Sequence, residues 1–372
     1  IYVRMEYPLA VENARHALRQ AKKLGLLGED ILGSGFNFDV SVHRGAGAFV
    51  SGESTALMNA LEGKVGEPRP KYLHTSECGV WNRPSLLNNV ETWANVPLII
   101  NQGSAWFSSL ATERSKGTKI FSLVGKVNQT GLVEVPMGMS LADIIYKIGG
   151  GIPEGKKLKG VQTGGPSGGI IPARHLETAV DFEELTRLGS MMGSGSIIVM
   201  DEDTCAVDLA RYFVDFLCDE SCGKCLPCRE GLKRMREILN RIVSGKGEEG
   251  DLEILRETAA LMKDASLCAL GRTAVNPVLS TMAYFPEEYA AHIRQKRCPS
   301  LSCKALVSYT IQPEKCLGCG QCLKNCPSKA ISEQGDVCVI DQSLCSRCGI
   351  CFDVCPPKAR AVKKTSRGDG AG

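Results

Sequence analysis

The chain has 372 residues, of which 43% are hydrophobic and 23% charged, and its net charge is +3. This length accommodates roughly two to four domains. The near-neutral charge gives no argument for a nucleic-acid partner, and no run approaches the ~20 apolar residues of a membrane-spanning helix. The sequence therefore predicts a globular multidomain protein with neither a nucleic-acid partner nor a membrane span.

The first 115 residues have the pattern of a mixed α/β segment. Residues 8–27 show helical spacing of apolar side chains, residues 38–45 alternate like a strand, and a glycine-rich turn leads into a helix from about Ser54. The chain begins at Ile1, without methionine, in a segment with strand character. We expect that an N-terminal piece is missing; the alternative is that only a disordered tail has been trimmed.

Residues 116–202 change to a pattern dominated by strands. Two strands flank a Gln-Thr-Gly turn, a short helix follows over residues 140–151, and the later strands are separated by glycine-rich turns. This order predicts a small β-grasp (ubiquitin-like) domain. The GGPSGG run at residues 164–169 lacks the Lys-Ser/Thr ending of a phosphate-binding loop, so we interpret it as a structural turn.

The rest of the chain divides into a helical region, a linker, an internal repeat and a disordered tail. The predicted bounds of these four parts are 203–295, 296–309, 310–362 and 363–372. Four candidate helices fill the helical region, over residues 205–218, 226–243, 250–264 and 272–294. Four such segments predict a four-helix bundle.

The chain contains 18 cysteines, which chance does not explain. A disulfide scaffold is disfavoured because a chain of this length builds its own cores. The thiols also fall in closely spaced runs, which ligate metals more readily than they pair. Such thiols need a reducing compartment, and we expect a cytoplasmic protein.

The two halves of the repeat carry the same run of cysteines, in CLGCGQCLKNCP and CSRCGICFDVCP. Both fit C-x2-C-x2-C-x3-C-P, the pattern of bacterial two-cluster ferredoxins. Three thiolates of each run bind one [4Fe-4S] cluster, and the fourth crosses to the other cluster. The predicted ligand sets are Cys316, Cys319, Cys322 and Cys355 for one cluster and Cys345, Cys348, Cys351 and Cys326 for the other.

A third run, ESCGKCLPCREG, lies in the helical region and has only three cysteines: Cys222, Cys225 and Cys228. Leu232 stands where the ferredoxin pattern has its fourth ligand. We predict that Cys268 supplies the missing thiolate of a third [4Fe-4S] cluster, because an antiparallel helix pair would return that end of the chain to the loop. A structural zinc ion with four cysteine ligands is the alternative.

Six cysteines remain outside these sets. Cys298 and Cys303 lie close to His292 in the chain, and one more thiolate would complete a closed zinc site. We choose Cys205 for that position, with Cys218 in reserve. The alternative is a group of inert buried thiols beside a surface histidine. The other cysteines are interpreted as packing residues: Cys78, Cys218 and Cys338.

Four ordered motifs carry a resemblance to a known family: GAGAFVSGESTALMNALEG, PSLLNNVETWANVP, ESCGKCLPCREG and SLCALGR. The chain resembles the flavin- and NADH-binding subunit of respiratory complex I over residues 1 to about 360. It resembles more specifically the homologous subunit of soluble NAD(P)-linked [FeFe] hydrogenases, including electron-bifurcating ones, which carries a C-terminal two-cluster ferredoxin domain. The resemblance implies FMN and NAD(P) as cofactors beside the three [4Fe-4S] clusters. It implies as partners a catalytic [FeFe] hydrogenase subunit, a thioredoxin-like [2Fe-2S] subunit and an external ferredoxin.

The resemblance also implies which residues bind the flavin. Asn88, Asn89 and Thr92 match the family's contacts to the flavin phosphate, with helix capping as the alternative interpretation. Gly52 and Glu53 match the turn that faces the flavin and nicotinamide rings, where Glu53 would steer the nicotinamide. The family's glycine-rich flavin loop has no counterpart in the chain, which favours the missing N-terminal piece.

Ser54 departs from the family pattern, which has glutamate near the adenosine ribose at this position. Loss of that negative charge would lessen repulsion of a 2′-phosphate, and Lys71 could pair with the phosphate. Arg69 and His74 are further candidates for this pairing. We hypothesise that the protein accepts NADP(H), with NAD(H) as the alternative.

We therefore expect an NAD(P)-dependent oxidoreductase, the diaphorase subunit of an electron-bifurcating hydrogenase complex. A hydride carries two electrons and each cubane accepts one, so a flavin is needed between them. The alternatives are the equivalent subunit of an NAD-linked formate dehydrogenase or other bifurcating reductase, or a non-catalytic electron-wiring subunit. The expected fold class is α+β multidomain, with an α/β FMN/NAD(P)-binding segment over 1–115, a β-grasp domain, a cluster-bearing four-helix bundle and a two-cluster ferredoxin domain.

Overall fold

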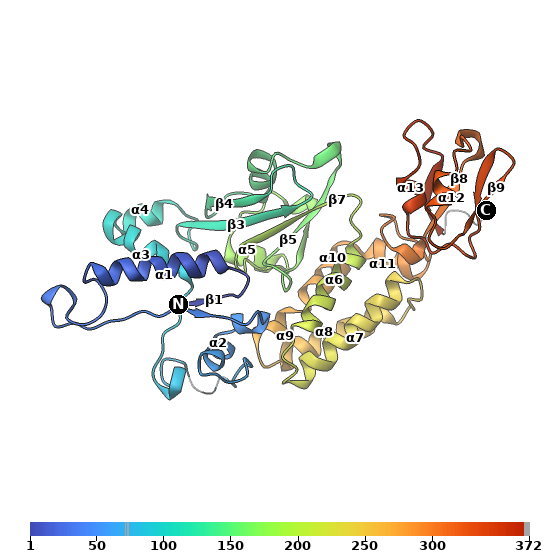
Figure 1. The fold of residues 1–372 in the computed structure, drawn as a ribbon. Coiled ribbons are helices and arrows are strands. Elements are labelled where there is room, and N and C mark those ends of the chain that lie inside the picture. The colour runs from blue at the N-terminus through green and yellow to red at the C-terminus, as the bar shows by residue number, and fades with distance from the viewer. Residues whose placement is uncertain (71, 73, 368–372) are drawn as a thin grey trace. The chain divides into compact units, whose positions relative to one another are not determined.

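A computed structural model describes residues 1–70, 72 and 74–367 (Figure 1). The chain forms two compact units. One consists of residues 1–93, 220–225 and 267–270, and the other consists of residues 94–219, 226–266 and those from 271 onward. In the part of the chain that the structure describes, no helix combines the length and the apolar character needed to cross a membrane.

The first unit is built from short elements. Helix α1 (Pro8–Lys23) ends where Gly25 takes a left-handed φ of 68°, and the Leu26 N–H donates to the Ala21 carbonyl. This Schellman-type ending stops the helix before residue 27. The strand predicted over 38–45 is shorter than expected. The remaining elements of this unit are β1 (Tyr2–Val3), its parallel partner β2 (His43–Arg44), α2 (Ser54–Leu61) and the start of α3 (Val90–Gln102).

A five-stranded mixed sheet lies in the second unit, with strand order β4-β3-β7-β5-β6. The bounds are β3 (Thr118–Gly125), β4 (Gly131–Pro136), β5 (Leu158–Thr163), β6 (Ile170–Pro172) and β7 (Ser196–Asp201). Ile144 and Ile145, from a helical turn over Asp143–Ile148, are buried in the same core as Phe121 and Val161 of the sheet. The short helix α4 (Ser104–Ser109) precedes β3 in the chain, and α5 (Phe182–Arg187) lies between β6 and β7. A helix packed on a mixed sheet is the β-grasp-like arrangement that the sequence predicts.

Six helices follow the sheet in the chain. They are α6 (Ala206–Asp219), α7 (Leu226–Val243), α8 (Asp251–Ala265), α9 (Ala269–Thr273), α10 (Asn276–Tyr284) and α11 (Pro286–Ile293). Helix α7 packs against α6 and α8, and α10 packs against α6. The single helix predicted over 272–294 is wrong, because it is divided into three. Pro286 breaks the pattern, since Phe285 before it has a non-helical φ of −132° and ψ of 47°.

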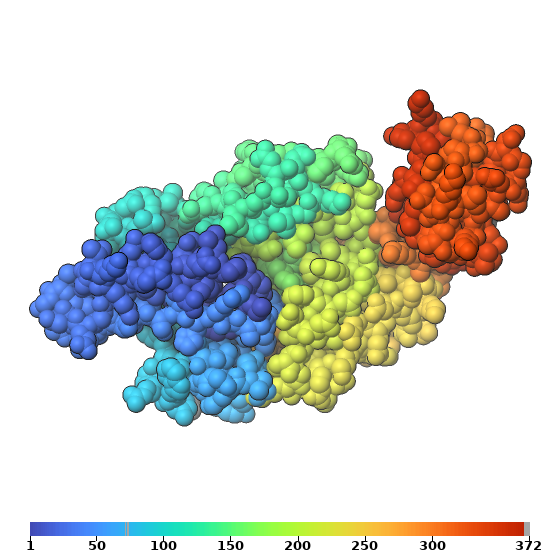
Figure 2. Space-filling view, in the orientation of Figure 1, coloured from blue at the N-terminus to red at the C-terminus, as the bar shows by residue number. Residues whose placement is uncertain are grey.

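The C-terminal region contains two similar halves. Its elements are β8 (Val307–Ile311), α12 (Gln321–Lys324), β9 (Ile331–Gln334), β10 (Val337–Ile340), α13 (Ile350–Asp353) and β11 (Val362–Ser366). The orange to red residues of this region lie together on the face shown in the space-filling view (Figure 2). The prediction of a disordered tail from residue 363 is wrong for residues 363–366. These residues belong to β11, which pairs antiparallel with β8 and buries Val362 and Ser366.

Gly231 allows α7 and α8 to approach closely. A Cβ atom at Gly231 would lie 2.5 Å from Met262 Sδ and 2.6 Å from Met262 Cγ. Real Cβ atoms essentially never come this close to another heavy atom, so a larger residue here would force the two helices or the methionine to move.

We expect Gly231→Val to lower the free energy of unfolding by about 1–3 kcal/mol, because it overpacks this contact. Met262→Ala should relieve the clash, so the double variant should lose less stability than the two single variants together. Urea unfolding of all four proteins measures this. Strict additivity would show that the two residues do not meet in solution.

Candidate cofactor sites

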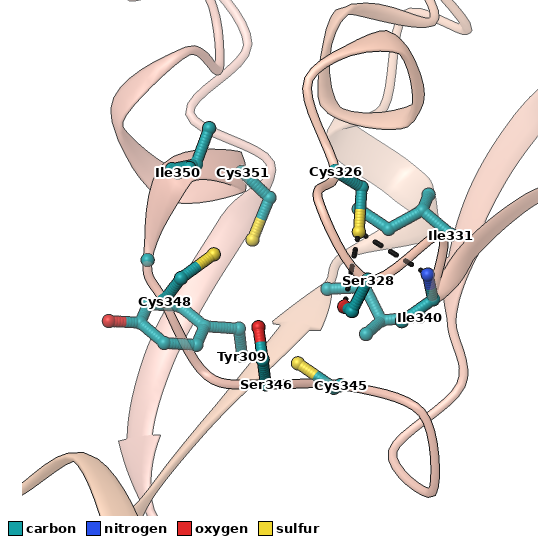
Figure 3. A pocket seen from close by; sticks show the side chains of 12 residues that line it. Tyr309, Cys326, Ser328, Ile331, Ile340, Cys345, Ser346, Cys348, Ile350 and Cys351 are labelled. Atoms are coloured by element: carbon teal, nitrogen blue, oxygen red, sulfur yellow. Dashed lines mark hydrogen bonds between the residues drawn. The ribbon is translucent and has the colours of Figure 1, made fainter.

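Four cysteines surround one cavity of the C-terminal region (Figure 3). Cys345, Cys348 and Cys351 come from the second half of the repeat, and Cys326 comes from the first. Figure 3 shows their four sulfur atoms directed toward a common space, with the ring of Tyr309 beside it. The structure thus brings together the four residues that the sequence predicts for one cluster.

Hydrogen bonds lower the pKa of one of these thiols, whereas burial and neighbouring thiols raise the pKa of another. Burial would raise the pKa of Cys326, but hydrogen bonds from Ser328 and from the Ala330 N–H, whose nitrogen lies 3.3 Å from Sγ, lower it. Burial and the neighbouring thiols Cys345 and Cys348 raise the pKa of Cys351 to about 11. Several thiolates in one partly buried cavity repel one another, so the donor set fits a cationic iron–sulfur core, which coordinates sulfur as thiolate.

A second cavity of the same region is lined by the other predicted set, Cys316, Cys319, Cys322 and Cys355. Here Cys355, from the second half of the repeat, lies with three cysteines of the first half. Cys338 on β10 also lines this cavity, is 2% exposed, and forms a hydrogen bond with Cys322. The sequence predicts only a packing role for Cys338. Its place beside this cavity could not be inferred from Val337–Ile340, which is apolar at every position.

Three cysteines of the helical region, Cys222, Cys225 and Cys268, lie on two segments of the first unit. The Leu267 N–H donates to the Cys225 sulfur, with a nitrogen–sulfur distance of 3.5 Å. This bond places the residue before Cys268 beside the C-x2-C run, as the predicted ligand set requires. Cys222 is exposed, whereas Cys228, in the first turn of α7, and Cys268 are buried.

Ser266 is a further polar group in this part of the chain. Its side-chain oxygen is buried and has no hydrogen-bond partner among the described residues. A Cβ atom at Gly271 would lie 2.6 Å from Ser266 Oγ and 3.0 Å from Cys228 Cβ, so the hydroxyl lies close to this cysteine. An orphaned hydroxyl beside a cysteine fits a site whose sulfur atoms accept hydrogen bonds.

The loop before α2 contacts the segment that carries Cys222 and Cys225. The Phe49 N–H donates to Glu220 Oε2 at 2.9 Å, and Lys224 forms an ion pair with Glu67 at 2.8 Å. The exposed ion pair contributes little stability, but the backbone bond fixes the loop. The turn that the resemblance assigns to the flavin ring therefore adjoins the turn that carries two candidate iron ligands. Glu220 opens the cysteine motif in the sequence, and its contact could not be inferred from the motif alone.

Glu53 caps helix α2. Its Oε2 atom accepts hydrogen bonds from the Thr55 and Ala56 N–H groups at 2.8 and 3.0 Å, and Ser54 Oγ donates to its Oε1 at 3.2 Å. A carboxylate at a helix N-terminus is stabilised by the helix dipole. The side chain that the resemblance assigns to nicotinamide steering thus also has a structural role. Gly52, directly before it, is exposed.

The three residues assigned to the flavin phosphate lie at the start of α3 and are all exposed. They are Asn88, Asn89 and Thr92. Asn89 Oδ1 accepts a hydrogen bond from the Glu91 N–H at 2.7 Å, as a helix-capping residue does. Asn89 therefore acts as a helix cap in this structure. The start of a helix also suits a phosphate, because its backbone N–H groups can donate hydrogen bonds to an anion.

Of the residues predicted to pair with a 2′-phosphate, one is not described by the structure and another is bonded within the protein. Lys71 lies outside the described residues. Arg69 is held within the protein: its Nε donates to Asn59 Oδ1 at 2.7 Å, and it forms an ion pair with Glu62 at 2.6 Å. Hydrogen bonds from Lys64 and Arg69 lower the pKa of Glu62 to about 2, so this carboxylate stays charged. Arg69 is thus already engaged by the protein.

Cys205, His292, Cys298 and Cys303 form one tight cluster. Their ligand atoms all lie within 4.8 Å of one another, and each residue is at most 4% exposed. His292 Nε2 lies 3.4 Å from Cys205 Sγ and 3.3 Å from Cys303 Sγ, and the two sulfurs are 3.7 Å apart. The structure brings together the four residues that the sequence analysis chose for zinc, and the reserve residue Cys218 is not among them.

These distances and groups fit a tetrahedral metal ion. Two thiolates bound to one zinc at ~2.3 Å would have sulfurs ~3.8 Å apart, close to the separation of Cys205 and Cys303. Burial would lower the pKa of His292, but hydrogen bonds with Cys205 and Cys298 raise it to about 10. His292 Nδ1 lies 2.7 Å from the Glu288 carbonyl oxygen, which leaves Nε2 toward the sulfurs. Four buried ligands without an open position are typical of a structural zinc site.

Sequence comparison identifies four families along the chain. They are the Nuo51 FMN-binding domain over residues 1–98, the SLBB domain over 120–171, the iron–sulfur binding region of NADH-ubiquinone oxidoreductase-F over 208–292 and a 4Fe-4S binding domain over 309–332. Their order agrees with the order of sites in the structure.

The chain is 53% identical over 332 residues to the NADP-reducing hydrogenase subunit HndC of Solidesulfovibrio fructosivorans, covering 89% of this chain and 68% of that protein. It is 44% identical over 299 residues to an F-type subunit of the NADH-quinone oxidoreductase of Rhizobium meliloti (strain 1021), covering 80% of this chain and 71% of the relative. It also matches a solved NAD+-reducing [NiFe]-hydrogenase in the H2-reduced state, with a TM-score of 0.70 and 32% identity. That match covers 79% of this chain and 48% of the solved chain, so this chain spans about half of it. The resemblance is confirmed: the chain belongs to the family of the F-type subunits of NADH-quinone oxidoreductase and their counterparts in NAD(P)-linked hydrogenases.

Proposed function

We propose that this protein is the flavin iron–sulfur subunit that passes electrons between NAD(P)H and three [4Fe-4S] clusters in a hydrogenase complex. The observation that carries the proposal is the grouping of the eight predicted ligands around two separate cavities, four to each, with each set drawing its fourth residue from the other half of the repeat. Sets of four cysteines are the usual ligands of cubane clusters.

The ligands of the third cluster are Cys222, Cys225, Cys228 and Cys268. The hydrogen bond between the Leu267 N–H and the Cys225 sulfur supports this set, because it holds the two ligand-bearing segments together. The contact between Phe49 and Glu220 supports a short path from the flavin turn to this cluster. Three clusters on one chain provide more than one branch, which suits electron bifurcation.

FMN, when bound, exchanges two electrons with a nicotinamide and single electrons with iron–sulfur clusters. The residues of this chain bind and position it. Gly52 leaves room for close approach of the ring, and the exposed start of α3 at Asn88, Asn89 and Thr92 offers backbone N–H groups to its phosphate. Glu53 holds the first turn of α2 in place and would steer the nicotinamide, as the resemblance implies.

The cluster of Cys205, His292, Cys298 and Cys303 holds a structural zinc ion. Cys205 precedes α6, His292 lies on α11, and the other two cysteines lie in the linker just before β8. A metal bound by all four would tie the linker of the C-terminal region to the helices. Closed tetrahedral sites of this composition act in folding rather than in catalysis.

We assign NADP(H) as the nicotinamide substrate, because Ser54 lacks the charge that repels a 2′-phosphate and because one close relative is named an NADP-reducing hydrogenase subunit. The proposed partners are a catalytic [FeFe] hydrogenase subunit, a thioredoxin-like [2Fe-2S] subunit and an external ferredoxin, in the cytoplasm. Nickel in the purified complex would overturn the [FeFe] assignment.

The cluster proposal predicts about 12 iron atoms in this chain of the anaerobically purified complex, in addition to the iron of the proposed partner subunits. Cys348→Ser should remove the signal of one cluster in electron paramagnetic resonance and up to four iron atoms, because it deletes one of four ligands. Cys78→Ser is the matched control and should keep all the iron, since Cys78 belongs to no set. Iron content close to zero in the unaltered protein would contradict the proposal.

The NADP(H) assignment predicts that kcat/KM of the complex is higher for NADPH than for NADH. Ser54→Glu should lower the preference for NADPH at least about tenfold, because it places a carboxylate near the 2′-phosphate. Ser54→Ala adds no charge and should keep the preference. A hundredfold preference of the unaltered complex for NADH would end the assignment.

The zinc proposal predicts about one zinc per chain. Changing Cys298 and Cys303 to Ser should remove that zinc and leave the iron unchanged. Cys218→Ser should leave both metals unchanged, because its thiol is outside the cluster. Metal analysis of the purified complexes decides this, and zinc that survives the double change would exclude these ligands.

A further inference from the structure

Lys159, on β5, is a largely buried lysine whose side chain is 13% exposed. A lysine is rarely buried unless its charge is paired. Its ammonium group pairs with Glu288 of α11, whose side chain is only 7% exposed. The same ammonium group lies 5.6 Å above the ring centre of Phe285. Nothing in the local sequence pattern pairs Lys159 with Glu288.

The lysine also reaches two segments that carry metal ligands. Its Nζ donates to the carbonyl oxygen of Thr204, the residue before Cys205. It lies 3.2 Å from Ser300 Oγ, which stands between Cys298 and Cys303 in the chain. Ser300 Oγ in turn donates to the Thr204 carbonyl oxygen at 3.2 Å. One ammonium group therefore joins the segment of Cys205 to the linker that carries two other ligands.

Glu288 extends this network to the remaining ligand. Its Oε2 accepts a hydrogen bond from the Ala206 N–H at 2.9 Å, on the other side of Cys205. Its backbone oxygen lies 2.7 Å from His292 Nδ1. With Nδ1 bonded to a carbonyl, the neutral imidazole presents the Nε2 lone pair to a metal. The Lys159–Glu288 pair thus contacts all three segments that carry the four ligands.

We propose that Lys159, acting with Glu288, is a positioning residue of the metal site, which brings its ligands together before the metal binds. The inference rests on the zinc site proposed above. Outer-shell partners that orient ligands are typically worth 10- to 100-fold in metal affinity. Because Lys159 belongs to the five-stranded sheet, the site links that sheet, the helices and the linker before β8.

The test uses the full chain in its purified complex and Zn2+ as the probe. Lys159→Met should speed zinc release to a chromophoric chelator by about 10- to 100-fold and leave the iron content unchanged. Lys157→Met is the matched control, because Lys157 lies two residues earlier and is exposed. It should release zinc at the rate of the unaltered protein. An unchanged release rate in Lys159→Met would overturn the inference.

Lys159→Met also leaves Glu288 buried without its partner, which destabilises a protein by itself. A second variant, Lys159→Met with Glu288→Gln, removes both charges. We expect it to regain thermal stability and still release zinc rapidly, because the bonds to Thr204 and Ser300 are absent. The absorption bands of the Co2+-loaded double variant should also shift, since the thiolates and imidazole are less well oriented.

The other possible results distinguish failure of the zinc site from failure of the positioning role of Lys159. If the double variant releases zinc like the unaltered protein, Lys159 serves only to neutralise a buried charge, and the positioning role is wrong. If the unaltered complex neither contains nor takes up zinc, the metal site itself is wrong, and the inference falls with it. Zinc binding by the unaltered complex together with normal release by Lys159→Met overturns the positioning role alone.

Discussion

Repulsion between neighbouring thiolates is the constraint on which the structure depends. Each cavity of the C-terminal region collects four predicted ligands, and the pKa of Cys351 is raised to about 11 by burial and by the adjacent thiols. The raised pKa keeps this thiol protonated, so all four sulfurs can become thiolates only when a positively charged core binds them. Binding of such a core is therefore coupled to loss of the thiol protons.

Two long-range contacts lie beside the candidate cofactor sites. Phe49 and Glu220 join the loop before α2 to the cysteine turn, and Lys159 and Glu288 join the sheet to the helices and the linker. Both contacts bind residues far apart in the sequence, and each ends beside a candidate ligand. Electron transfer needs cofactors at fixed separations, and the Phe49–Glu220 bond holds the loop before α2 beside the cysteine turn.

Spacing motifs predicted the two groups of cysteines that the structure brings together around cavities, because the geometry of a cubane dictates gaps such as those between Cys316, Cys319 and Cys322. The proposal of Cys268 as partner of the third run came from the expected return of an antiparallel helix. The long-range contacts of Lys159 and Glu220 left no local signal, since a charged residue in a strand or a turn is usually solvated. The break at Phe285 and the strand at residues 363–366 were missed because each depends on what the chain packs against, and sequence periodicity does not record that.

The pairing of β8 with β11 brings the two ends of the C-terminal region together. Val307 lies opposite Ser366 in that ladder, so the polypeptide enters and leaves the region at the same edge. The Cys298 N–H donates to Ser366 Oγ, 3.1 Å away, which fastens the exit to the entry. A module with adjacent ends can be appended to another polypeptide, or removed from it, by one recombination event without opening either fold. The adjacent ends of the C-terminal region therefore allow it to be transferred as a unit between redox enzymes.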